Sequence, residues 1–114
     1  MYRKIAAQEL ANFLGSISNP TRIRIIEELR NGELDVSTLQ TLLDEAQSKI
    51  SQNLSVLKGQ KIVHERKEGR RVFYSLTIPQ LAKWLTDGLI LIEEKTTGEK
   101  ELIKAIHSAK KKWE

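Results

Sequence analysis

The sequence predicts a mainly α-helical protein with one small β-hairpin, in the order α-α-(short β)-α-α-β-β-α-α. Apolar residues recur at helical spacing through most of the chain. The pattern changes once, at residues 62–76, where β-branched and aromatic residues surround a glycine-containing turn. With 114 residues, a single domain is expected, because so short a chain rarely holds two independent cores.

Composition excludes several classes of protein. The chain has no cysteine, which rules out disulfides, thiolate-bound zinc, iron–sulfur clusters and thiol redox sensing. The longest apolar run, residues 89–92, is far shorter than the roughly 20 residues of a membrane span. The basic N-terminus lacks the apolar stretch of a secretion signal. We therefore expect a cytoplasmic protein with no membrane partner.

Two helices are predicted before the first extended segment. The first, residues 6–17, has apolar side chains at helical spacing, namely Leu10, Phe13, Leu14 and Ile17. Asn19-Pro20 predicts the start of the second, because Asn caps helices and Pro fits the first helical position. This helix is expected to reach about Arg30 and to end at Asn31-Gly32. Residues 33–36 then form a short extended link.

The next two elements predict a helix-turn-helix. Ser37-x-x-Gln40 has the form of a capping box that opens a short helix. A turn at residues 44–46 leads into a helix over residues 47–58, which Gly59 is expected to end. Two short helices joined by a tight turn, the second richer in polar residues, are typical of this motif.

Strand character follows at residues 62–66 and 71–76, with Gly69 in the turn between them. A hairpin directly after a helix-turn-helix is a wing, so the fold predicted is a winged helix-turn-helix. Pro79 begins another helix that reaches about residue 95, and Thr96-Thr97-Gly98 is a weak break. The last amphipathic helix carries a stripe made of Leu102, Ile106, Ala109 and Trp113.

The second helix of the motif has one face suited to DNA. Its apolar residues Ile50, Leu54 and Leu57 fall within about 60° on a helical wheel. The remaining surface is small and polar, with no acid from residue 47 to 55, whereas an ordinary exposed helix is rich in Glu and Lys. Glutamine can bond adenine, and serine can bond bases or phosphates. We expect base reading by Gln47, Ser48, Ser51 and Gln52.

Positive charge is concentrated in residues 46–76, where seven basic and two acidic side chains give +5, against +4 for the whole chain. Such a segment favours a polyanion partner, because phosphate contacts release counterions. Contacts to the DNA backbone or minor groove are expected from Lys49, Ser55, Arg66, Lys67, Arg70 and Arg71. The alternative is a solvated hairpin whose Lys and Arg residues prevent edge aggregation.

These segments, taken in order, resemble the ArsR/SmtB family of winged helix-turn-helix repressors. Four stretches carry the resemblance and match the family's opening pattern, next segment, recognition helix and wing: residues 14–26, 32–36, 47–57 and 68–76. The resemblance implies one winged-helix domain over residues 1–114. Within it, residues 1–17 would be a dimerisation helix, 18–78 the DNA-binding core and 79–114 a helical dimerisation region.

The resemblance also implies a homodimer on an inverted-repeat operator in double-stranded DNA, each recognition helix in a major groove. The terminal helices of such proteins form the dimer interface. The matching apolar residues here are Leu10, Phe13, Leu14, Ile17, Leu85, Leu89 and Ile92. The alternative is that these stripes only complete the core of a monomer.

The chain departs from the family where signals are sensed. Asp35 and Ser37 stand in a region where many members have metal-binding cysteines. Asp87 lacks a histidine two residues later, and His107 has no histidine partner. We therefore predict no cofactor and no metal site, and an effector, whether a small molecule or a protein, stays open.

Enzyme activity is not expected, because the sequence has no phosphate-cradling glycine loop, nucleophile elbow or zinc-protease motif. The predicted function is a sequence-specific DNA-binding transcriptional regulator, a dimeric repressor. Two alternatives are a winged-helix module for protein contacts and a non-specific architectural DNA binder. The first would expose apolar or acidic residues on the helix at 47–58, and the second would lack sequence preference.

Overall fold

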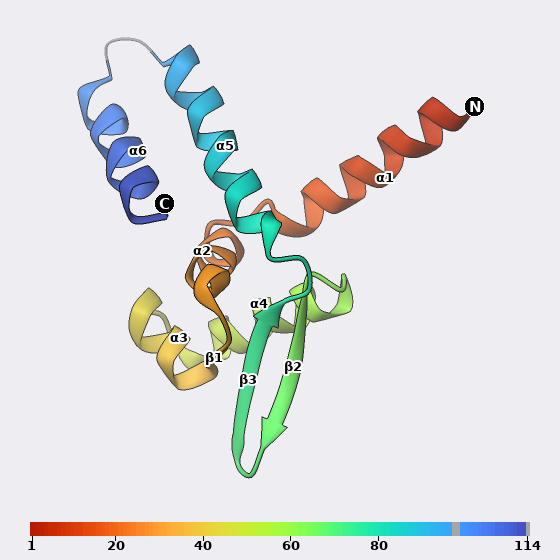
Figure 1. Cartoon of the computed structure of the whole chain (residues 1–114), viewed down its shortest axis with the longest axis vertical. Helices are drawn as coiled ribbons and strands as arrows, with labels where there is room; N and C mark the ends of the chain where they lie inside the picture. Colours follow the sequence, from red (N-terminus) through yellow and green to blue (C-terminus); the bar gives the residue numbers. More distant parts are fainter. Residues whose placement is uncertain (97–98, 114) are drawn as a thin grey trace. The chain divides into compact units, whose positions relative to one another are not determined.

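The structure is a computed structural model that describes residues 1–96 and 99–113. It divides into two compact units, residues 1–78 and 79–114. The elements of the first unit are α1 (Tyr2–Ile17), α2 (Pro20–Glu28), the 3-10 turn η1 (Leu29–Asn31), β1 (Leu34–Asp35), α3 (Val36–Leu43), α4 (Gln47–Gly59), β2 (Val63–Glu68) and β3 (Arg71–Leu76). The second unit holds α5 (Gln80–Lys95) and α6 (Lys100–Trp113) (Figure 1). The predicted element order and winged helix-turn-helix fold are confirmed.

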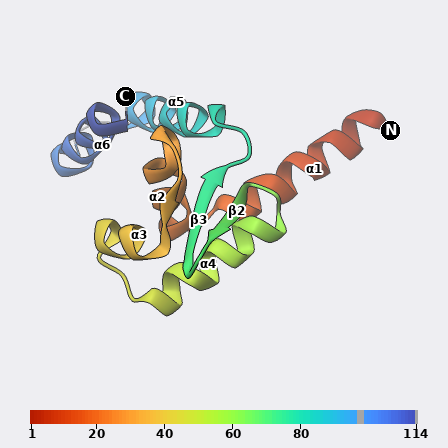
Figure 2. The same cartoon turned by 60° about the horizontal axis from the view of Figure 1, so that its bottom comes forward.

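The wing belongs to a three-stranded antiparallel sheet in the order β1-β3-β2. Figure 2 shows its hairpin of β2 and β3. The strands β2 and β3 pair from Val63↔Leu76 to Glu68↔Arg71, so β2 extends two residues beyond the predicted strand. The reason is a turn of only two residues, in which Gly69 has a φ of 61°. A positive φ at the first central residue is the conformation of a type II′ hairpin turn, which glycine adopts without strain.

The predicted cap of α2 is confirmed. The Asn19 side chain accepts hydrogen bonds from the backbone amides of Thr21 and Arg22, at 2.9 and 3.2 Å, with Pro20 at the first helical position. The α-helix ends earlier than predicted, at Glu28, and continues as the 3-10 turn η1.

The predicted capping box at Ser37 is wrong. The helix α3 begins one residue earlier, at Val36, and its N-cap is Asp35, whose carboxylate accepts a hydrogen bond from the Thr38 amide at 2.9 Å. Aspartate and serine are comparable N-caps, and the start of β1 at Leu34 leaves Asp35 at the strand-to-helix junction.

The end of α4 also differs from the prediction, because Gly59 remains helical and Lys61 adopts the left-handed conformation, with φ 59°. The Ile62 amide donates to the Leu57 carbonyl at 2.9 Å, and the Lys61 amide donates to the Lys58 carbonyl at 3.0 Å. These two bonds form a Schellman motif. Leu57 and Ile62 flank this motif and are both buried. Their burial favours a helix end at the Schellman motif over one at Gly59.

The core of the first unit confirms the helical stripe predicted for α4. Ile50, Leu54 and Leu57 are fully buried. They join buried residues of α2, η1, α3 and the wing strands, namely Ile25, Ile26, Leu29, Leu39, Leu43, Val63 and Leu76. The rotation of α4 about its axis is thereby fixed.

In the second unit, α5 and α6 form a helical hairpin. Glu93 of α5 lies 3.1 Å from the His107 ring and 3.2 Å from the Lys110 ammonium group of α6. The predicted α6 stripe is mixed in exposure, because Ile106 is buried while Leu102 is exposed. Residues Thr97 and Gly98 of the predicted break lie outside the described residues. No helix in the described part of the chain is long and apolar enough to cross a membrane.

Replacing Leu54 by Ala will destabilise the protein by about 2–5 kcal/mol, because the side chain is 0% exposed and its loss leaves a cavity. Val56 in the same helix is 37% exposed, so Val56→Ala will cost less than about 1 kcal/mol. Urea unfolding at one fixed protein concentration measures both changes. Equal losses in the two variants would contradict the assigned rotation of α4.

Candidate nucleic-acid interface

The polar face of α4 lies opposite its buried stripe. All four predicted base readers, Gln47, Ser48, Ser51 and Gln52, are exposed. So are Lys49 and Ser55, which were predicted to contact the DNA backbone. The structure thus brings six of the predicted site residues together on one helix. Val56 is the exposed apolar residue of this helix.

The position of α4 depends on the turn that precedes it. Asp44 ends α3 in the left-handed conformation, with φ 52°. Arg24 of α2 donates hydrogen bonds to the carbonyl oxygens of Leu43 and Leu42, at 3.0 and 3.2 Å. A cation on the last carbonyls of a helix satisfies unpaired acceptors and interacts favourably with the helix dipole. Arg24 therefore ties the C-terminal end of α3 to α2, a contact that no local pattern in the sequence indicated.

The wing has two distinct faces, because successive side chains of a strand point to opposite sides. Val63, Glu65 and Lys67 of β2 share one side, which we call the inner face. Glu65 accepts a hydrogen bond from Lys58 of α4 at 2.7 Å and another from the Tyr74 hydroxyl at 3.0 Å. The inner face is therefore the side that carries α4.

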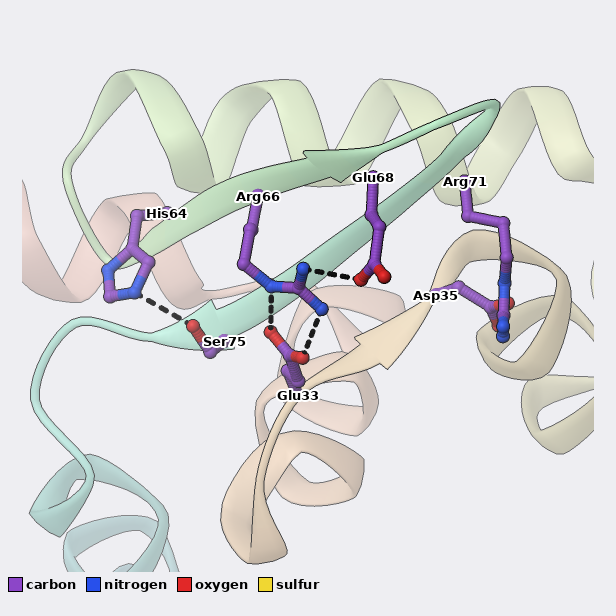
Figure 3. Close-up of polar contacts among 7 residues, drawn as sticks. All are labelled: Glu33, Asp35, His64, Arg66, Glu68, Arg71 and Ser75. Atoms are coloured by element: carbon purple, nitrogen blue, oxygen red, sulfur yellow. Dashed lines mark hydrogen bonds and ion pairs between the residues drawn. The ribbon is translucent and has the colours of Figure 1, made fainter.

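The opposite side, which we call the outer face, holds His64, Arg66 and Glu68 of β2. Arg66 donates to both carboxylate oxygens of Glu33, at 2.6 and 3.1 Å, and to Glu68 at 2.7 Å (Figure 3). His64 contacts the Ser75 hydroxyl at 2.8 Å on the same side. Sequence reasoning missed Glu33, because the ion pair joins residues 33 positions apart.

Arg71 of β3 also lies on the outer face. It donates to Asp35, the N-cap of α3, at 2.7 and 3.2 Å. The guanidinium carbons of Arg66 and Arg71 lie over the Phe73 ring, at 4.6 and 4.7 Å from its centre. Two of the four predicted wing contacts are thus bound to carboxylates and an aromatic ring of the protein itself.

These contacts shift several pKa values. Hydrogen bonds from Thr38, followed by the pairing with Arg71, lower the pKa of Asp35 from 3.8 to about 2. The hydrogen bond from Arg66 lowers the pKa of Glu33, and that from Lys58 lowers the pKa of Glu65. Burial, followed by the hydrogen bond to Glu65, raises the pKa of Tyr74. The carboxylates are thus held ionised.

Lys67 and Arg70 differ from their arginine neighbours. Both are exposed, and neither forms an ion pair with any residue in the ranges 1–96 and 99–113. Lys49 of α4 pairs with Glu45 at 3.2 Å, but this is a single exposed contact one helical turn away. Exposed pairs held by a single contact are weak, whereas the Arg66–Glu33 pair, although also exposed, has the bidentate geometry that makes such pairs effective. These three cations are available to an anionic partner.

The residues predicted for a dimer interface lie in both units and differ in exposure. On α1, Leu10 and Leu14 are exposed, Phe13 is half-buried and Ile17 is buried. On α5, Ile92 is exposed, whereas Leu85 and Leu89 are half-buried. Over the described residues, no three His, Asp or Glu side chains gather in a way that could hold a metal ion.

Comparison with known proteins identifies the class. Residues 19–65 match the sequence profile described as "Bacterial regulatory protein, arsR family". The chain is 35% identical over 91 residues to the arsenical resistance operon repressor of Escherichia coli, with 79% of this chain and 74% of that protein covered. It is 36% identical over 70 residues to a transcriptional repressor SmtB homologue of Synechocystis, covering 61% of this chain and about half (53%) of that protein.

Among solved structures, the chain resembles the transcriptional repressor BigR from Xylella fastidiosa, with a TM-score of 0.70 and 32% identity. The likeness covers 79% of this chain and 90% of that one. The fold and the polar helix with its wing define a winged-helix transcriptional regulator, and regulators of this family bind DNA. The chain belongs to the arsR family of bacterial regulatory proteins, which are regulators and not enzymes.

Asp35→Asn will make the free energy of unfolding less dependent on pH in the acid range. Because the folded pKa lies below the unfolded value of 3.8, the ionised carboxylate contributes stability that is complete above about pH 4 and is lost as the pH falls towards about 2. Urea unfolding of both proteins across this window tests the prediction. If the unfolding free energies of wild type and variant fall equally with pH, the assigned role of Asp35 is contradicted.

Proposed function

We propose that the protein is a homodimeric repressor that binds an inverted-repeat operator, with α4 of each subunit in a major groove. The observation that carries the proposal is the acid-free polar face of α4, exposed beside a basic wing. Gln47, Ser48, Ser51 and Gln52 are the proposed base readers, since glutamine and serine can hydrogen-bond base edges in that groove.

Contacts to the DNA backbone are proposed for Lys49 and Ser55 of α4 and for Lys67 and Arg70 of the wing. Their exposure supports this role, and so does the absence of ion pairs at Lys67 and Arg70 within the described residues. Phosphate contacts of this kind supply affinity without sequence preference. Arg66 and Arg71 were predicted to share the task, but their contacts with carboxylates of the protein itself favour a different role.

The homodimer is proposed to use the apolar residues of both terminal regions. Leu10 and Leu14 of α1 and Ile92 of α5 support the proposal, because they remain exposed in the single chain. Two-fold symmetry of the protein would match an inverted repeat of half-sites one or more helical turns apart. We propose residues 1–17 and 79–114 as the dimerisation regions, 18–78 as the DNA-binding core, and the cytoplasm as the compartment.

Fluorescence anisotropy tests the function directly. The full chain is titrated onto its own upstream DNA and onto a scrambled duplex, at two salt concentrations and with chelator present. Tight and sequence-preferring binding with chelator supports a repressor whose DNA-bound state needs no metal, and the search for an effector would follow. Equal binding to both duplexes would favour an architectural role, and no binding to either would favour a protein-contact module.

Gln52→Ala will weaken operator binding by about 1–3 kcal/mol and relax the preference at one position, because a base reader is removed. The matched control is Gln60→Ala, an exposed glutamine just beyond the end of α4. Anisotropy on operator and scrambled duplexes gives the affinity ratio for each variant. An unchanged ratio for Gln52→Ala would remove this residue from the reading face.

Leu14→Glu will convert the dimer to a monomer at micromolar concentration, because it places a charge in an interface of apolar residues. Leu14 is 42% exposed, and Leu42 of α3 is 43% exposed but lies outside the proposed interface. Leu42→Glu is therefore the matched control and will remain dimeric. Sedimentation velocity measures the mass of each variant. A Leu14→Glu protein that stays dimeric would exclude α1 from the interface.

A further inference from the structure

The outer face of the wing carries a compact cluster of six residues from three stretches of the chain: Glu33, Asp35, Arg66, Glu68, Arg71 and Phe73. Figure 3 shows all of them except Phe73. We infer that Arg66 and Arg71 are positioning residues, which brace the wing against β1 and the start of α3, and that Lys67 and Arg70 alone make the wing's phosphate contacts. The inference rests on the proposed DNA-binding function.

The cluster carries no net positive charge. It contains two guanidinium groups and three carboxylates, so its net charge is −1 although it lies in the most basic segment of the chain. If Arg66 turned towards a phosphate, Glu33 and Glu68 would be left unpaired next to a polyanion. The outer face therefore does not attract DNA as a unit. The wing tip has two cations, Lys67 and Arg70, that form no ion pair among the described residues, although the charge of Lys67 helps to lower the pKa of Glu65 on the inner face.

The side chains of Arg66 and Lys67 lie on opposite faces of the wing. Arg66 pairs across the sheet with Phe73, and Phe73 pairs with Asp35 on its other side, so all three share the outer face. Lys67 alternates with Arg66 and lies on the inner face with Glu65, which contacts Lys58 of α4. A duplex bound by α4 would therefore meet the side of the wing that carries Lys67, and not the side that carries Arg66.

The cluster also reinforces a short junction between β1 and β3. The backbone pairing of β1 with β3 consists of only two residue pairs, Leu34↔Tyr74 and Asp35↔Phe73. Arg66–Glu33 and Arg71–Asp35 extend this short junction with side-chain contacts on both sides of it. Because Asp35 also caps α3, one carboxylate joins the wing strand to the first helix of the helix-turn-helix. The cluster thus fixes the angle at which the wing leaves the motif.

Four variants, each removing one positive charge from the hairpin, test the inference: Arg66→Gln, Arg71→Gln, Lys67→Gln and Arg70→Gln. The readout is the slope of log affinity against log salt on the upstream duplex, together with the melting temperature. We expect Lys67→Gln and Arg70→Gln each to reduce the slope by about 0.9, the share of one neutralised phosphate, with an unchanged melting temperature. We expect Arg66→Gln and Arg71→Gln to lower the melting temperature with an unchanged slope.

A conservative variant separates charge from bracing. Arg66→Lys keeps the cation but loses the two-pronged bond to Glu33, so it will melt at a lower temperature than wild type while its salt slope is unchanged. A slope that falls in Arg66→Gln as much as in Lys67→Gln, and is restored in Arg66→Lys, would overturn the inference, because that is the behaviour of a phosphate-binding cation.

A double-mutant cycle keeps the test independent of DNA. If Arg66 acts through Glu33, the Arg66→Gln and Glu33→Gln double variant will be destabilised by less than the sum of the two single variants. Additive losses would overturn the bracing role. If wild type binds no duplex, the proposed function fails, and a non-additive cycle would still support the brace.

Discussion

The burial of Ile50, Leu54 and Leu57 is the constraint on which the rest of the structure depends. These side chains occupy one narrow stripe of α4, so packing them against α2, α3 and the sheet determines how the helix is rotated. The same rotation exposes Gln47, Ser48, Ser51 and Gln52 together. The proposed reading face is thus a consequence of core packing, since no contact made by these four side chains is needed to orient them.

Two arginines with different tasks hold the parts around α4 in place. Arg24 of α2 binds the last carbonyl oxygens of α3, just before the turn that leads into α4. Arg71 binds the residue that caps the other end of α3. Both ends of this short helix are therefore tied to neighbouring elements by guanidinium groups, which suit such sites because they remain charged and donate in a fixed geometry. A basic residue in a nucleic-acid-binding protein can thus stabilise the fold.

The helices and their start signals were predictable because their causes are local. Asn19 and Pro20 lie next to the amides they cap, and the apolar spacing of α4 is visible in eleven consecutive residues. The error at the start of α3 also has a local cause, because Asp35 and Ser37 are competing caps only two residues apart. Gly59 was predicted to end α4, but burial of Ile62 favoured a stop at Lys61. At the end of α4, tertiary burial thus decided between two helix ends that the local sequence allowed.

The sequence by itself determined the order of the elements, the absence of thiol chemistry, the buried stripe of α4 and its acid-free face, since each depends on residue type and on spacing within one element. Only the tertiary structure decided which wing cations are engaged. Arg66 meets Glu33 across 33 positions, and Arg71 meets Asp35 across 36. Such pairs follow from strand register and from the side of the sheet on which each residue falls. The physical reason is that Arg66 and Arg71 meet Glu33 and Asp35 only when folding brings distant strands together.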